Sequence, residues 1–383
     1  MPVPLDYETL RLAWWLLLGL VLIGFAVMDG FDLGVAILLP VVARGDVERR
    51  VVINSIGPVW DGNQVWLILG GGAAFAAWPP LYAIAFSVFY IPLLLVLAAL
   101  ILRPVGFDFR NKVADRRWRA TWDGLLFLGG LVPSLVFGVA FGNLLLGVPF
   151  ALTDELRVVY TGGVLLDFLT PFAVLTGLVS LAMITLHGAT YLALRTEGAI
   201  ERRAASAALA SAGALVLLLT LAGWLVATRI EGQAVVGALA HDLPSNPLLK
   251  QVARRPGGWL ANYGAHPWTM AAPALAYAGA FGAVILTFLR RRGLAFLASA
   301  GAVFGVVSTA GLALFPFLMP SRSNPSQGLT VWDASSSRLT LFIMLLATVV
   351  VLPIVASYTV FVYRVLRGKI TVRHVEEHGE HLY

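Results

Sequence analysis

The residues of this sequence most able to do chemistry are aspartates set inside long apolar stretches. Asp29 and Asp32 lie three positions apart, so a continuous helix would place both on one face. Two like charges at that spacing favour holding a proton between them, so one of the two should titrate high. Asp61 lies in the next apolar stretch, where a charge is costly unless it faces a partner or water. We therefore predict that these acids handle protons.

Further ionisable residues extend this group. Asp108 and Lys112 are four positions apart in a predicted loop, Asp123 follows near a helix end, and only Asp167 falls in the opposite half of the membrane. Clustering toward one side suits proton uptake from the cytoplasm. Buried aspartates also cap broken helices and pair with arginines across subunit contacts, and this alternative stays open.

Metal and haem ligands are scarce. His187 is the one histidine in a predicted span, and Met183 lies four residues before it on the same helix face, so the two could not bracket one haem iron. We expect His187 to be a hydrogen-bonded packing residue. The sequence has no cysteine, which excludes disulfides and thiolate metal sites, and it contains no motif typical of soluble enzymes. We predict no metal ligand in the chain.

Long apolar helices must position these residues. The chain has 383 residues, of which 59% are hydrophobic and 13% charged. A soluble protein could not cover its surface with so few charges, so we predict one all-α integral membrane domain over residues 1–383. We predict no nucleic-acid partner. Apolar runs of about 20 residues span hydrocarbon. About nine transmembrane helices are predicted, at 9–31, 54–78, 81–102, 120–142, 160–193, 204–228, 268–289, 294–318 and 340–363.

Basic residues set the orientation of these helices. Most of the lysines and arginines fall in alternate loops, such as those holding Arg49 and Arg116, and in the segment after Tyr363. The basic side faces the cytoplasm, which puts the N-terminus outside and the C-terminus inside. The first apolar run has no cleavage site and is expected to be retained. We predict a multi-pass protein of a bacterial cytoplasmic (inner) membrane.

A weak internal echo suggests a duplication. Asp29-Gly30 precedes a Glu-Arg-Arg triplet, and His187-Gly188 precedes another. We interpret residues 1–150 and 151–325 as two four-helix units, and residues 326–383 as one peripheral helix with a cytoplasmic tail.

Glycine spacing and loop composition predict the packing. The first apolar run, Leu10 to Ala43, is too long for a straight span, so it should tilt or break near Gly30 and Gly34. Outer loops at 229–267 and 319–339 are rich in turn residues and should form ordered caps. The tail from Val372 to Tyr383 should be solvated. Three Gly-xxx-Gly pairs predict close helix contacts: Gly30/Gly34, Gly138/Gly142 and Gly301/Gly305.

The segment from Asn54 to Trp66 is the most unusual in the chain. It reads NSIGPVWDGNQVW, so polar groups, a proline and glycines fall inside a predicted span. Such a helix is distorted, and its freed backbone groups must be satisfied by protein or water. Trp66 should lie deeper than a residue of the interfacial aromatic belt.

This segment resembles the hallmark of subunit II of cytochrome bd-type ubiquinol oxidases. The resemblance covers nearly the whole chain, since further motifs follow in the order typical of the family. They are Gly24-Phe25-Ala26 with Asp29-Gly30-Phe31-Asp32, Arg103-Pro104-Val105-Gly106-Phe107-Asp108, Gly138-Val139-Ala140-Phe141-Gly142-Asn143, Phe315-Pro316 with Met319-Pro320-Ser321, and Trp332-Asp333-Ala334-Ser335-Ser336.

The resemblance implies a heterodimeric respiratory enzyme. The family oxidises membrane quinol and reduces O2 to water, with haem b and haem d in subunit I and none in subunit II. Subunit II packs against subunit I, sometimes beside a small single-helix subunit, and binds a structural quinone in some members.

The resemblance also implies roles for particular residues. Positions matching Asp61, Asp108 and Lys112 are associated with proton delivery, to which our reading of the residues adds Asp29 and Asp32. The position matching Trp66 lies near an O2 route. Val59 departs from relatives that carry histidine there, which puts a relay through that position in doubt.

Two other readings remain. Buried acids, broken helices and weak repeats are also typical of a secondary transporter or another proton-conducting membrane protein. Alternatively, the chain is a pure scaffold whose acids only pair with subunit I.

Overall fold

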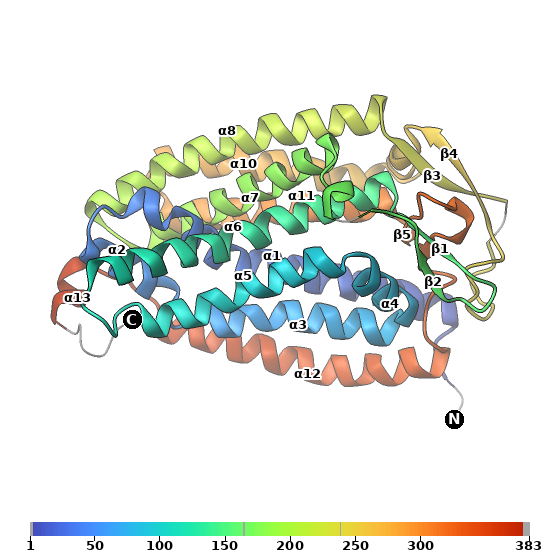
Figure 1. Ribbon diagram of the computed structural model, residues 1–383, viewed down its shortest axis with the longest axis horizontal. Helices are drawn as coiled ribbons and strands as arrows, with labels where there is room; N and C mark the ends of the chain where they lie inside the picture. The colour runs from blue at the N-terminus through green and yellow to red at the C-terminus, as the bar shows by residue number, and fades with distance from the viewer. Residues whose placement is uncertain (1–2, 164, 238, 378–383) are drawn as a thin grey trace.

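The computed structural model describes residues 3–163, 165–237 and 239–377, and most of them lie in long helices that run side by side (Figure 1). The all-α fold expected of a membrane protein is confirmed. The long helices are α1 (Tyr7–Val42), α3 (Trp60–Ala77), α5 (Tyr90–Phe109), α6 (Arg116–Leu146), α7 (Pro171–Arg195), α8 (Gly198–Thr228), α10 (Ala271–Phe288), α11 (Arg292–Leu314) and α12 (Arg338–Val365).

Shorter elements connect and cap the bundle. The short helices are α2 (Asp46–Ile56), α4 (Pro79–Val88), η1 (Leu165–Phe168), η2 (Gly258–Leu260), α9 (Ala261–Ala265), η3 (Pro267–Met270), η4 (Pro325–Gln327) and α13 (Val372–Glu377). The strands are β1 (Phe150–Leu152), β2 (Val158–Tyr160), β3 (Glu231–Val236), β4 (Gln251–Pro256), β5 (Phe317–Met319) and β6 (Leu329–Thr330). They form three antiparallel pairs, β1–β2, β3–β4 and β5–β6.

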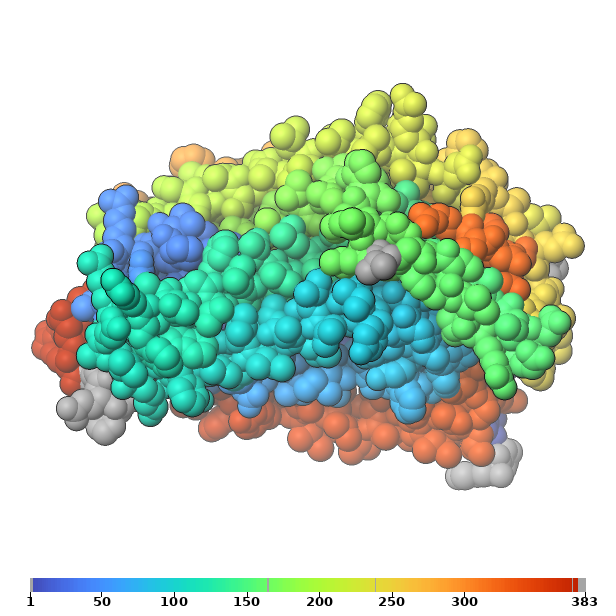
Figure 2. All heavy atoms as spheres, in the orientation of Figure 1, coloured from blue at the N-terminus to red at the C-terminus, as the bar shows by residue number. Residues whose placement is uncertain are grey.

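The two ends of the bundle differ. The β-pairs gather at the end where α1 starts, whereas α2 and α13 lie at the opposite end (Figures 1 and 2). Both predicted outer loops therefore form the ordered caps that their composition suggested.

At the β end, Lys250 forms a buried ion pair with Asp333 at 2.8 Å. Burial lowers the pKa of Lys250, and the Asp333 carboxylate opposes that shift.

Eight helices of the described chain are long and apolar enough to cross a membrane, against about nine predicted. The difference falls on the predicted span 54–78. There α2 ends at Ile56 and α3 starts at Trp60, and α3 has only 18 residues. Asp61, Asn63 and Gln64 in its first turns lower its hydropathy, although α3 still packs against α1 and lies beside α12 (Figure 1).

Several predicted boundaries differ from the structure. Helix α1 runs for 36 residues to Val42, past the predicted end of the first span at residue 31, and of the two alternatives given for this run no break occurs near Gly30 and Gly34. The predicted span 160–193 starts too early, because α7 begins at Pro171 and the residues before it form β2 and η1. Asp167 consequently lies on the exposed surface of η1 and not in a membrane helix.

The glycine pairs do make close helix contacts. A side chain on Gly34 would come within 2.2 Å of the Ile184 carbonyl oxygen on α7, and one on Gly142 would come within 2.7 Å of the Ala173 Cα. Gly305 is equally close to the backbone of α10 at Ala276, at 2.3 Å. Gly301 has only ordinary contacts, so its match to the pattern has no close-packing role.

The last helices lie at the edge of the bundle. Helix α12 runs along the outside of the bundle (Figure 1), and Leu341 is its only buried residue. Residues Val372–Glu377 of the predicted solvated tail form α13, in which Val375 is buried, whereas Val372, Arg373, Glu376 and Glu377 are exposed as expected. Residues 378–383 of the predicted tail lie outside the described residues. The division into units 1–150, 151–325 and 326–383 stays a prediction.

Candidate functional site

Asp29 and Asp32 lie on the buried face of α1, one helical turn apart, and neither side chain is exposed to solvent. Arg103 of α5 donates two hydrogen bonds to Asp29, at 3.0 and 2.7 Å. Its Nη2 atom is 3.8 Å from the Oδ2 atom of Asp32. The predicted pair of buried acids is thus brought together, and it shares one fully buried guanidinium.

Arg103 was expected in a loop beyond the span 81–102. It lies instead inside α5, which continues past Pro104 to Phe109, and its side chain is fully buried. A basic residue at the end of an apolar run usually marks a loop, and nothing in the local spacing distinguishes this one.

Two residues that the site prediction missed extend the cluster. Asn63 of α3 donates a hydrogen bond from Nδ2 to the Oδ2 atom of Asp32 at 2.7 Å. Tyr363 of α12 donates its hydroxyl to the Oδ1 atom of Asn63, also at 2.7 Å. A chain of hydrogen bonds therefore runs from the peripheral helix to the buried carboxyl.

Asp61 points away from this cluster. It lies two residues before the buried Asn63 on α3, so the helical rotation turns the two side chains to different faces. Asp61 is exposed, as are Val65 and Ile68 at the next positions of the same stripe. This face of α3 combines an acid with exposed apolar side chains.

Asp108 lies in the last turn of α5 and Lys112 in the turn that follows the helix, and both are exposed. Helix α3 begins and α5 ends toward the same end of the molecule, the end that carries α2 and α13 (Figure 1). The predicted proton residues therefore fall into two groups: Asp61, Asp108 and Lys112 on the surface, and Asp29 with Asp32 in the interior.

Asp123 belongs to a network of ion pairs at this end. It pairs with Arg110 at 2.6 Å and with Arg49 at 2.7 Å, while Asp46 pairs with Arg110 and Arg119. These contacts join α2 to α5 and α6. The arrangement fits the alternative that a buried acid serves as a structural ion-pair partner.

His187 has both ring nitrogens engaged. Nε2 lies 2.9 Å from the Val27 carbonyl oxygen, Nδ1 lies 2.8 Å from the Ser299 hydroxyl, and the ring stacks on Phe296. These contacts leave neither ring nitrogen of His187 free to bind haem iron. Within the described residues, no group of three or more His, Cys, Asp or Glu side chains is placed to hold a metal.

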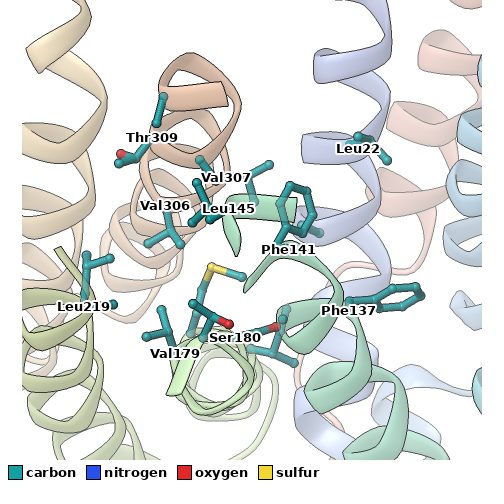
Figure 3. Close-up of a pocket in the computed structure, with 18 of the residues that line it drawn as sticks. Leu22, Phe137, Phe141, Leu145, Val179, Ser180, Leu219, Val306, Val307 and Thr309 are labelled. Carbon is teal, nitrogen blue, oxygen red and sulfur yellow. The ribbon is translucent and has the colours of Figure 1, made fainter. Parts of the chain in front are cut away.

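An apolar cavity of about 260 Å³ opens among α1, α6, α7, α8 and α11 (Figure 3). Phe137, Phe141, Val179, Leu219 and Val306 line it. The few polar groups in its wall are hydroxyls. Such a lining suits a long hydrocarbon chain.

Trp66 is half-buried on α3 and packs against α1. A side chain on Gly24 would come within 2.5 Å of the Trp66 ring, so this glycine provides the space that the indole occupies. Trp66 therefore packs at the contact between α3 and α1, and its depth in the membrane stays a prediction.

Comparisons with known proteins agree over nearly the whole chain. The family described as cytochrome bd terminal oxidase subunit II matches residues 10–366. The chain is similar to cytochrome bd-I ubiquinol oxidase subunit 2 of Escherichia coli, with 47% identity over 99% of this chain and 100% of the relative. It is also similar to cytochrome bd ubiquinol oxidase subunit 2 of Bacillus subtilis, with 30% identity over 94% of this chain and 96% of the relative.

A solved structure shares the fold. It is a chain of the bd oxidase from Geobacillus thermodenitrificans, with a TM-score of 0.67, 12% identity, and coverage of 95% of this chain and 100% of that chain.

Proposed function

The chain belongs to the cytochrome bd terminal oxidase subunit II family. From this premise we propose that it acts as a scaffold for a haem-bearing subunit I and supplies that subunit with protons and O2. The complex is a quinol oxidase, and this chain is one of its subunits. His187 is already hydrogen-bonded through both nitrogens, which supports the placement of haem b and haem d in the partner. Membership of this family argues against the alternative that the chain is a secondary transporter.

The stripe of α3 that holds Asp61, Val65 and Ile68 is the proposed contact with subunit I. A carboxylate beside exposed apolar side chains would be costly against lipid tails, whereas a protein partner can satisfy it. The exposed α12 runs beside α3 at the same edge (Figure 1) and would extend the contact. A small single-helix subunit could bind the remaining surface of α12.

A cytoplasmic proton path is proposed along the surface group. Asp108 and Lys112 would take up protons from water, and Asp61 would pass them to the partner. This requires the end with α2 and α13 to be cytoplasmic and the β end to face outward, as the basic residues predict. The exposure of Asp61 on the partner-facing stripe is the observation that carries this proposal.

Asp61→Asn tests the path. The purified complex should keep its haem content and lose O2 consumption several-fold, because the amide cannot transfer a proton. Oxygen-electrode rates and haem spectra of the same sample measure both quantities. Asp154→Asn, in an exposed turn at the β end, is the matched control. Parallel loss of haem would favour the pure scaffold, and unchanged turnover would contradict the relay.

Two apolar ligands are proposed as well. O2 would enter laterally past Trp66, where the indole packs on Gly24.

The tail of a structural quinone would fill the cavity among α1, α6, α7, α8 and α11. Ala222→Trp, placed in the cavity wall, should lower the quinone extracted per haem; an unchanged amount would exclude this site.

A further inference from the structure

The buried cluster around Asp32 contains more carboxyl groups than cations. Asp29 and Asp32 come from α1, and Arg103 from α5 is the cation that contacts them. The other titratable groups near Asp32 are Tyr191 of α7 and Tyr363 of α12. Tyr191 donates its hydroxyl to the Ser55 carbonyl oxygen. Neither tyrosine supplies a positive charge.

Arg103 is committed to Asp29. Two parallel hydrogen bonds join its guanidinium to both carboxylate oxygens, which is the strongest geometry available to this pair. Asp32 receives only a contact of 3.8 Å, beyond hydrogen-bond distance. An ionised Asp32 would thus be a second buried negative charge without a cation of its own.

The two oxygens of Asp32 have different surroundings. Oδ2 accepts the hydrogen bond from Asn63. Oδ1 is buried and has no hydrogen-bond partner among the described residues. The Tyr363 hydroxyl donates to the amide oxygen of Asn63, so the amide NH2 is directed at Asp32. The amide therefore keeps Oδ2 as an acceptor.

We propose that Asp32 is a proton-binding site, with the proton on Oδ1, and that Asn63 and Tyr363 are positioning residues for it. The bound proton leaves the cluster neutral, since Asp29 and Arg103 balance each other. An amide does not readily relay a proton, so Asn63 fixes the carboxyl without making Tyr363 a proton donor to it. This site does not depend on the proposed route through Asp61.

Infrared spectroscopy of the purified oxidase complex tests the proposal. Aspartate labelled with a heavy carbon isotope in its carboxyl identifies the bands. Subtracting the spectrum of Asp32→Asn from that of the wild type should reveal a protonated carboxylic-acid band at neutral pH. If Asp32→Asn instead removes an ionised carboxylate band from the wild-type spectrum, the proposal is overturned.

Tyr363→Phe tests the positioning role while keeping the carboxyl and every charge. Because the amide would no longer be held by the hydroxyl, the acid band of Asp32 should shift in frequency. Tyr358→Phe is the control, since Tyr358 lies on the same helix and is 66% exposed. A shift with Tyr363→Phe alone supports the positioning role. Identical spectra for the two variants would overturn it, and this comparison is readable even if Asp32→Asn does not assemble.

Discussion

At the scale of residues, the interior of this bundle gives different partners to two aspartates that lie one helical turn apart. Asp29 is held by Arg103 through two hydrogen bonds, whereas Asp32 is held by the neutral Asn63. Removing one partner from a buried ion pair leaves an uncompensated charge, while replacing a neutral carboxyl by an amide does not. The two acids should therefore differ in what they contribute to stability.

Asp29→Asn should destabilise the complex strongly, by about 3–5 kcal/mol, because Arg103 would remain charged and buried. Asp32→Asn should cost much less. The midpoint of thermal unfolding, followed by loss of the haem absorbance, measures both variants under the same conditions. Equal losses of stability would show that the two carboxyls carry the same charge.

Sequence alone identified the acids but not what holds them. Asp29, Asp32 and Asp61 stand out because charges are rare in apolar stretches. Tyr363 could not be found this way, since it contacts Asn63 across 300 positions of sequence and its helix has no polar pattern. Asp167 was misplaced because apolar residues also fill β2 and η1 ahead of α7.

At the scale of elements, the contact of α1 with α7 depends on the absence of side chains. Gly34 faces the backbone of Ile184 and Gly188, and backbone atoms cannot move aside as a flexible side chain can. The glycine pair in the sequence was compatible with either a helix break or a close contact. The packing against α7 supports an unbroken α1.

Gly34→Ala should force α1 away from α7 and cost about 1–3 kcal/mol through overpacking. Gly19→Ala, on the same helix, has open space around it and should be neutral or slightly stabilising, since alanine favours helices. Thermal unfolding of the assembled complex compares the two. A stability for Gly34→Ala equal to that of Gly19→Ala would refute the close contact.

At the scale of the whole molecule, composition and periodicity were sufficient to predict a membrane bundle with ordered caps at one end. They could not separate a helix face that meets lipid from one that meets a protein, because both are apolar with the same spacing. The exposed Asp61 on the stripe with Val65 and Ile68 supports our proposal that this face meets a protein. The chain thus has the features of one subunit of a larger assembly.

The central claim is that this chain is the haem-free subunit of a quinol oxidase, and co-purification tests it most directly. The chain should be tagged, purified in mild detergent from its native membrane, and examined by gel and by a reduced-minus-oxidised optical spectrum. We predict haem b and haem d bands that travel with a second membrane subunit. A colourless protein that purifies without such a subunit would contradict the account.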